Sequence, residues 1–142
     1  MNAAQLKDIH PDDVVLWLHV EAACRRLAVA SKARVTIIRP TPKNETWDYW
    51  GLCDWTGGTR KRPLGPFEIN LTVRQCFKGE WMERASLPYL LETIAHEIAH
   101  CHAGWKADHG EKFYREYARM ILLSEKLKIR RDILKCGVKI PE

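Results

Sequence analysis

Apolar residues recur at helical spacing over residues 87–103. Ser86 can cap the first turn, and Pro88 suits that turn because its missing N–H costs little there. Gly104 can end the helix. The pattern therefore predicts one amphipathic helix over residues 87–103. Its apolar positions are Leu87, Leu90, Leu91, Ile94, Ala95 and Ile98.

Two other segments show helical spacing, and a third is rich in charge. Asp12 and Asp13 can begin a helix that runs to about residue 30. Apolar side chains recur again over residues 110–125, which predicts a helix directly after the motif region. The basic segment Lys126–Lys135 is also expected to be helical, within a C-terminal stretch that covers residues 126–142.

Three short segments read as strands. Residues 34–39 are β-branched and end at a proline, residues 47–55 alternate aromatic with small or polar side chains, and residues 67–73 alternate cleanly. Glycine and proline over residues 56–66 predict a turn or loop, and residues 74–85 are expected only to lead into the next helix. The order of elements predicts an α+β fold. A small, mainly antiparallel sheet of about three strands would pack on the helix at 87–103.

The composition is that of one globular domain spanning residues 1–142. The hydrophobic fraction is 46%, and no apolar run approaches the length of about 20 residues that a membrane helix needs. The five cysteines are scattered and form no C-x-x-C pair, so neither a zinc ribbon nor a disulfide framework is predicted. A reducing, cytoplasmic location is the simplest expectation.

The predicted helix carries the pentapeptide His96-Glu97-Ile98-Ala99-His100, which has the H-E-x-x-H form. Residues four apart share one face of a helix, so the imidazoles of His96 and His100 can hold one zinc ion. Zinc lowers the pKa of a bound water molecule, and the Glu97 carboxylate can then accept its proton. The expected chemistry is attack of water on a carbonyl group, typically that of a peptide bond.

A catalytic zinc site needs a third protein ligand. His102 lies about 200° around the helix from His100 and should point away from the metal. His109 follows the stop at Gly104, and a turn there can return it to the first two histidines. Glu111 and Glu116 remain alternative ligands. The spacing favours His109.

These residues resemble the SprT-like zinc metalloprotease domain, the family that includes Spartan. The resemblance rests on the H-E-x-x-H motif followed by His109-Gly110-Glu111-Lys112-Phe113, and it is close over residues 87–120. It implies a zincin-like fold, one Zn²⁺ held by His96, His100 and His109, and Glu97 as general base. YgjP-like metallohydrolases have a similar arrangement. Unlike several SprT-like proteins, this chain carries no cysteine-rich zinc ribbon after this region.

The resemblance also implies substrates and partners. Zincins bind substrate as an extra strand along a sheet edge, which we expect near residues 67–73 or 47–55. SprT-like enzymes act on proteins bound or crosslinked to DNA. The formal net charge of +5 fits DNA binding through Arg60, Lys61 and Arg62 or through Lys126–Lys135. The alternative is that these cations only keep the protein soluble, while Trp47, Trp50 and Trp55 fill the core of the sheet.

Two other functions compete with a zinc metallopeptidase. A different zinc hydrolase, such as a metal-dependent nuclease, could use three histidines, but such sites lack a glutamate at the position of Glu97. A non-catalytic module with structural zinc would need a fourth protein ligand, and Cys101 lies about 100° around the helix from His100. We expect Cys101 to be a buried thiol. Tyr89, Tyr114 and Tyr117 are equal candidates for stabilising the oxyanion.

Overall fold

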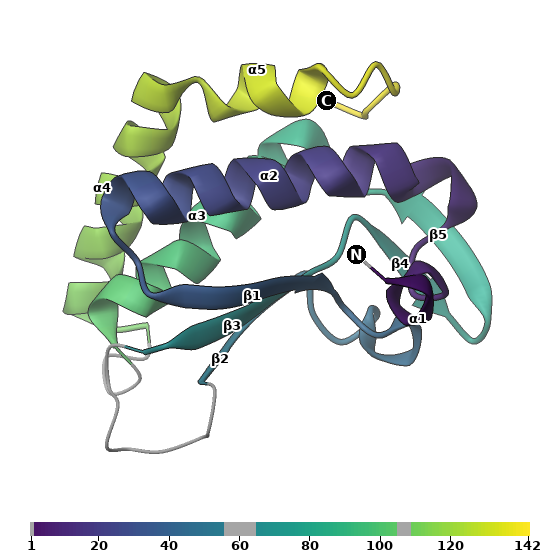
Figure 1. Cartoon of the computed structure of the whole chain (residues 1–142), viewed down its shortest axis with the longest axis horizontal. Coiled ribbons are helices and arrows are strands. Elements are labelled where there is room, and N and C mark those ends of the chain that lie inside the picture. The colour runs from purple at the N-terminus through teal and green to yellow at the C-terminus, as the bar shows by residue number, and fades with distance from the viewer. Residues whose placement is uncertain (1, 56–64, 105–108) are drawn as a thin grey trace.

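Three strands form a mixed sheet that helices cover (Figure 1). The computed structural model describes residues 2–55, 65–104 and 109–142. The strands are β1 (Val35–Pro40), β2 (Gly51–Trp55) and β3 (Phe67–Leu71), in the order β1-β3-β2. Strand β3 pairs in parallel with β1 and antiparallel with β2, and Ile69 lies opposite both Ile38 and Cys53.

The pairing of the strands differs from the expected one. The sheet contains one parallel pair and is therefore mixed rather than mainly antiparallel. The segment between β1 and β2 contains the short helix η2 (Lys43–Glu45), and β3 lies between the two strands in the sheet. The expectation that residues 67–73 form an edge is wrong, because β3 is central. Among the described strands, β2 pairs only with β3 and forms an edge.

The structure contains three long helices whose bounds agree with the predicted ones. The helix at 87–103 has the predicted bounds, and the other two differ from theirs by at most two residues at either end. The three helices are α2 (Val14–Ser31), α3 (Leu87–Ala103) and α4 (Glu111–Leu127). The basic segment is divided, because Lys128 has a φ of 58° and ends α4 before α5 (Ile129–Leu134) begins. The short helices α1 (Ala3–Leu6) and η1 (Pro11–Asp13) precede α2. No helix in the described ranges has the length and apolar character needed to span a bilayer.

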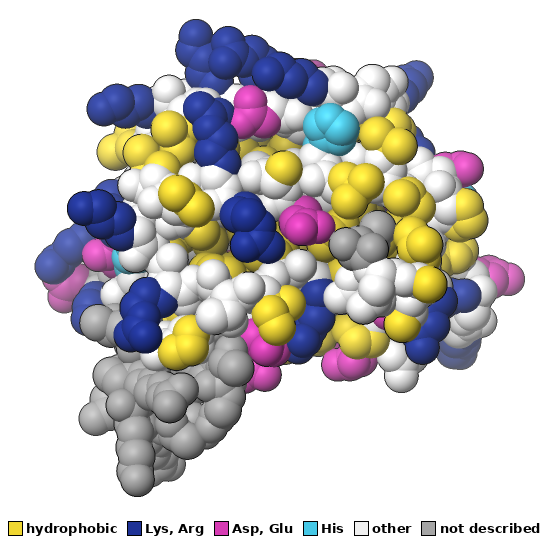
Figure 2. All heavy atoms as spheres, viewed as in Figure 1, with side chains coloured by type: hydrophobic (Ala, Val, Ile, Leu, Met, Phe, Trp, Pro, Cys, Tyr) yellow, Lys and Arg dark blue, Asp and Glu magenta, His cyan; other side chains and the backbone are white. Residues whose placement is uncertain are grey.

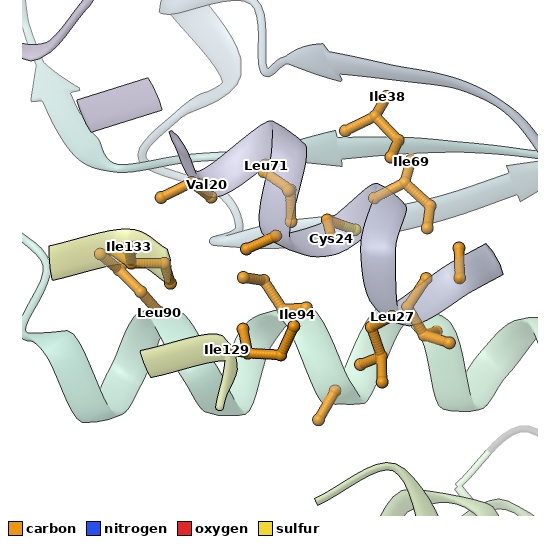
Figure 3. Packing of buried hydrophobic residues seen from close by; sticks show 14 of the residues in the cluster. Val20, Cys24, Leu27, Ile38, Ile69, Leu71, Leu90, Ile94, Ile129 and Ile133 are labelled. Atoms are coloured by element: carbon orange, nitrogen blue, oxygen red, sulfur yellow. The ribbon is translucent and has the colours of Figure 1, made fainter. Parts of the chain in front are cut away.

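The core lies between the sheet and the helices. Helix α2 packs against β1, α3 packs against β2 and β3, and α5 contacts both helices. Figure 3 shows their apolar side chains converging, including Cys24, Ile69, Ile94 and Ile133. This mixed arrangement of helices and a small sheet confirms the predicted α+β class.

A β-hairpin occupies a segment that was expected only to connect β3 to α3. Strands β4 (Arg74–Phe77) and β5 (Glu80–Arg84) pair antiparallel around Lys78 and Gly79, which have φ values of 51° and 81°. A two-residue loop with both φ angles positive is typical of a type I′ turn. Gly79 is a typical residue of such a turn, but Lys78 is not, so the sequence signal for this hairpin was weak.

Candidate metal centre

The H-E-x-x-H motif lies in the last two turns of helix α3, whose two ends are both marked by capping residues. The Ser86 hydroxyl accepts a hydrogen bond from the Tyr89 amide, and Gly104 ends the helix with a φ of 85°. Leu90 and Ile94 anchor one face in the core. His96 and His100 are half-buried on another face, one turn apart.

The structure brings His109 to the first two histidines. Nε2 of His96 lies 3.2 Å from that of His100 and 3.3 Å from that of His109, and the third separation is 3.2 Å. A tetrahedral ion about 2.0–2.1 Å from each nitrogen would hold pairs of nitrogens about 3.3 Å apart. The three imidazoles therefore form a group that could hold a metal ion.

Phe113 supports all three candidate ligands. Its ring centroid lies 4.8 Å from that of His96, 4.5 Å from that of His100 and 4.9 Å from that of His109. Phe113 is 1% exposed and lies in the first turn of α4, three residues after the cap at Gly110. The packing of α4 on α3 thus fixes the orientation of the histidine rings.

Glu97 is buried beside the candidate ligands. Its side chain is only 5% exposed, and burial raises the pKa of Glu97 to about 8. The start of β2 lies directly against it, since a Cβ atom on Gly51 would be 2.5 Å from Glu97 Oε2 and 2.8 Å from Thr93 Cγ2. Only glycine leaves room for the carboxylate at this point.

Burial also affects His96. Desolvation, followed by the charge of His109, lowers the pKa of His96. A lowered pKa favours the neutral imidazole, which is the form that binds a metal ion.

A cavity of about 360 Å³ opens beside His96 and Glu97. Aromatic rings form much of its wall, and the centroids of Trp50 and Tyr89 are 5.3 Å apart. This volume is within the range of small-molecule and side-chain binding sites. The residues lining the cavity are Tyr49, Trp50, Gly51, Tyr89, Glu92, Thr93, His96, Glu97 and Tyr117.

The alternative ligands lie outside the histidine group. His102 Nε2 is 2.9 Å from Ser31 Oγ, so this imidazole contacts α2 instead. Glu111 forms an ion pair with Arg115 at 2.9 Å. Glu116 pairs with a different arginine on α4, Arg119. None of these three belongs to the metal-binding group found among the described residues.

Cys101 is a buried thiol, as expected, with 3% of its surface exposed. Its Sγ donates a hydrogen bond to the Glu97 carbonyl oxygen over 3.4 Å and lies 3.6 Å from Cys53 Sγ. These contacts direct the thiol toward β2 and away from the histidine triangle. Cys101 therefore does not supply a fourth ligand to the group found among the described residues.

The structure describes one of the two basic segments considered for DNA binding. Arg60, Lys61 and Arg62 lie outside the described residues. Figure 2 shows lysine and arginine side chains gathered over α5 along the upper edge of the molecule. In the Lys126–Lys135 segment, Arg130 pairs with Glu142 at 2.8 Å. Four exposed cations there have no acidic partner among the described residues: Lys126, Lys128, Arg131 and Lys135.

The tryptophans do not all fill the core of the sheet. Trp47 is 47% exposed and packs on Phe77 of the hairpin, with ring centroids 4.5 Å apart. Trp50 lines the cavity, and the side chain of Trp55 lies outside the described part. The aromatic residues near the sheet therefore serve two different surfaces.

Sequence reasoning did not select two residues of the site. Gly51 was assigned to the middle of a strand, and Thr93 only to a helix. Gly51 lies against Glu97 because β2 packs on α3, which no local pattern reveals. Thr93 precedes Glu97 by four residues on α3, so helical spacing could have indicated it. Comparison with models of protein families, with curated proteins and with solved structures finds no match for this chain.

Proposed function

We propose that this chain is a zinc-dependent metalloendopeptidase with a zincin-like, SprT-like active site. The observation that carries the proposal is the triangle of Nε2 atoms from His96, His100 and His109 beside the buried carboxylate of Glu97. Three protein ligands and a neighbouring general base are typical of catalytic zinc. A structural zinc would need a fourth protein ligand, and the nuclease alternative would not need Glu97.

The residues present divide the reaction between them. Zinc held by the three imidazoles would polarise the substrate carbonyl and lower the pKa of the attacking water. Glu97 accepts the proton of that water and passes it to the amine that leaves when the peptide bond breaks. Gly51 keeps the carboxylate in the cavity, and Phe113 keeps the imidazoles in place.

The position of β2 supports an extended polypeptide as substrate. Gly51 begins this edge strand and also lines the cavity, so the edge leads directly to the candidate metal centre. A peptide that adds to β2 would bind through main-chain hydrogen bonds. We therefore expect cleavage that depends weakly on sequence.

The cations around α5 support substrates that are bound to DNA. Lys126, Lys128, Arg131 and Lys135 are exposed, and no acidic side chain among the described residues neutralises them. Such a cluster attracts phosphates. We propose that DNA bound there brings a protein substrate to the metal centre.

Proteolysis of a DNA-binding protein by zinc-loaded enzyme, with and without single-stranded DNA, tests this function. We expect Glu97→Gln to keep one zinc per chain and to lose at least about 100-fold in rate, because the amide cannot accept the proton. We expect DNA to increase cleavage by the unaltered protein.

Glu111→Gln is the matched control, because Glu111 lies close in sequence but is 88% exposed and outside the cavity. It should leave the rate unchanged. Normal cleavage by the Glu97→Gln protein would contradict the general-base assignment. Cleavage that DNA does not affect would leave a peptidase without the proposed recruitment.

A further inference from the structure

Tyr117 is the tyrosine whose ring lies beside a candidate metal ligand. It lies on α4, four residues after Phe113, so both rings lie on the same face of that helix. The ring centroids of Tyr117 and His96 are 5.8 Å apart, at an interplanar angle of 81°. Tyr117 also lines the cavity that contains Glu97. Its phenol thus faces the space in which a substrate carbonyl would lie.

The other tyrosines are placed differently. Tyr114 is 61% exposed and does not line the cavity. Tyr89 lies seven residues before His96, which is about 10 Å along the helix axis, and its ring contacts Trp50. The Tyr49 hydroxyl already donates a hydrogen bond to Glu45 Oε1 over 3.3 Å.

The Tyr117 hydroxyl has no protein partner among the described residues. The side chain is half-buried, and no hydrogen bond joins it to any side chain or backbone group in the described ranges. A tyrosine hydroxyl in a partly buried position normally has a hydrogen-bond partner. A donor that is left open toward a reaction cavity is available to a bound ligand.

We infer that Tyr117 donates a hydrogen bond to the oxyanion that forms when water attacks the scissile carbonyl. The inference rests on the proposed peptidase function. Tyr117 keeps its proton throughout, so its role is electrostatic: the O–H dipole stabilises negative charge that is present only in the transition state. Such a donor raises kcat and leaves KM nearly unchanged.

Tyr117→Phe tests this role, because the change removes the hydroxyl and keeps the ring that packs on His96 and Phe113. With one zinc per chain in each sample, we expect kcat to fall about 100-fold and KM to change less than about threefold. A phosphinic peptide mimics the tetrahedral oxyanion, so its inhibition constant should rise by a similar factor. Tyr114→Phe, a hydroxyl deletion on the same helix outside the cavity, should behave as the unaltered protein.

Three outcomes would count against the inference, and they are distinguishable. If the unaltered zinc-loaded protein cleaves no peptide, the proposed function itself is contradicted, and the role of Tyr117 is rejected with it. If the unaltered protein is active and Tyr117→Phe is equally active, only the role of Tyr117 is overturned. A fall in kcat without weaker binding of the phosphinic peptide would show that the Tyr117 hydroxyl acts at another step and not on the oxyanion.

Discussion

At the scale of single residues, the placement of Glu97, the proposed general base, depends on a position without a side chain. Glu97 is nearly fully buried, so a larger neighbour would change the position of its carboxylate. Gly51 is that neighbour, and the carboxylate occupies the space that a Cβ atom would fill. Catalysis depends on sub-ångström placement of such groups, since an error of about 1 Å can cost 100-fold in rate.

We therefore expect Gly51→Ala to lower kcat by at least about tenfold. The new methyl group would meet both Glu97 and Thr93, so the carboxylate would be displaced from the cavity. Zinc content should stay at one per chain because the three atoms nearest to the new methyl group belong to Glu97 and Thr93 and not to a candidate ligand. Steady-state kinetics with metal analysis checks the prediction.

The double change Gly51→Ala with Thr93→Ala relieves one of the two contacts and should recover part of the loss. An unchanged kcat in the single variant would show that Glu97 tolerates displacement.

The sequence predicted the site residues that share a local pattern. His96 and His100 follow from helical spacing, and the glycines around His109 indicated that this residue could return to them, where the structure has it. Gly51 and Tyr117 could not be selected in this way. They belong to β2 and α4, and only the tertiary packing of these elements on α3 brings them to the cavity.

At the scale of elements, one buried carboxylate holds several segments together. Asp13, at the start of α2, is fully buried and accepts hydrogen bonds from Arg74 of β4 and Arg84 of β5 over 2.6–2.9 Å. Arg84 also donates to the carbonyl oxygen of Lys139 over 2.6 Å. Asp13 therefore links the first long helix, the hairpin and the C-terminal segment.

Asp13→Asn should lower the free energy of unfolding by about 3 kcal/mol at pH 7, because it leaves two partly buried arginines without their carboxylate. Burial alone would raise the pKa of Asp13, but hydrogen bonds from the two arginines outweigh it and lower that pKa. The stabilising contribution is thus complete above the unfolded-state pKa of about 3.9 and is lost as the pH falls through the lower folded-state value.

Urea denaturation of the metal-free proteins at pH 7 and pH 3 measures this difference. The gap in unfolding free energy between the unaltered protein and Asp13→Asn should be large at pH 7 and smaller at pH 3. Metal-free samples are needed because acid would release zinc for other reasons. Equal stabilities at pH 7 would mean that the hairpin does not depend on Asp13.

Elements with strong end signals were the most predictable. Helix α3 matches its predicted bounds because Ser86 and Gly104 mark its two ends. The hairpin was missed because its strands show no clean alternation and its polar positions, such as Arg74 and Arg84, face the buried Asp13. Strand β2 begins at Gly51 and not at residue 47, because residues 46–48 form a turn directly after η2.

At the scale of the whole molecule, the candidate metal centre joins two parts of the fold. His96 and His100 belong to α3, whereas His109 precedes α4, so a bound ion would tie these helices together. The sequence predicted the α+β class from the order of its elements. It could not predict the strand order β1-β3-β2, because pairing between distant segments depends on packing against α2 and α3 and not on local periodicity.

X-ray absorption spectroscopy at the zinc edge, on protein whose metal content has been measured, is the most direct test of this account. We expect one zinc per chain, with three imidazole nitrogens and one further oxygen or nitrogen at about 2.0–2.1 Å. His109→Ala should lose one imidazole from this set and bind zinc more weakly. A sulfur ligand at about 2.3 Å, or an unchanged coordination shell in the His109→Ala protein, would contradict a catalytic three-histidine centre.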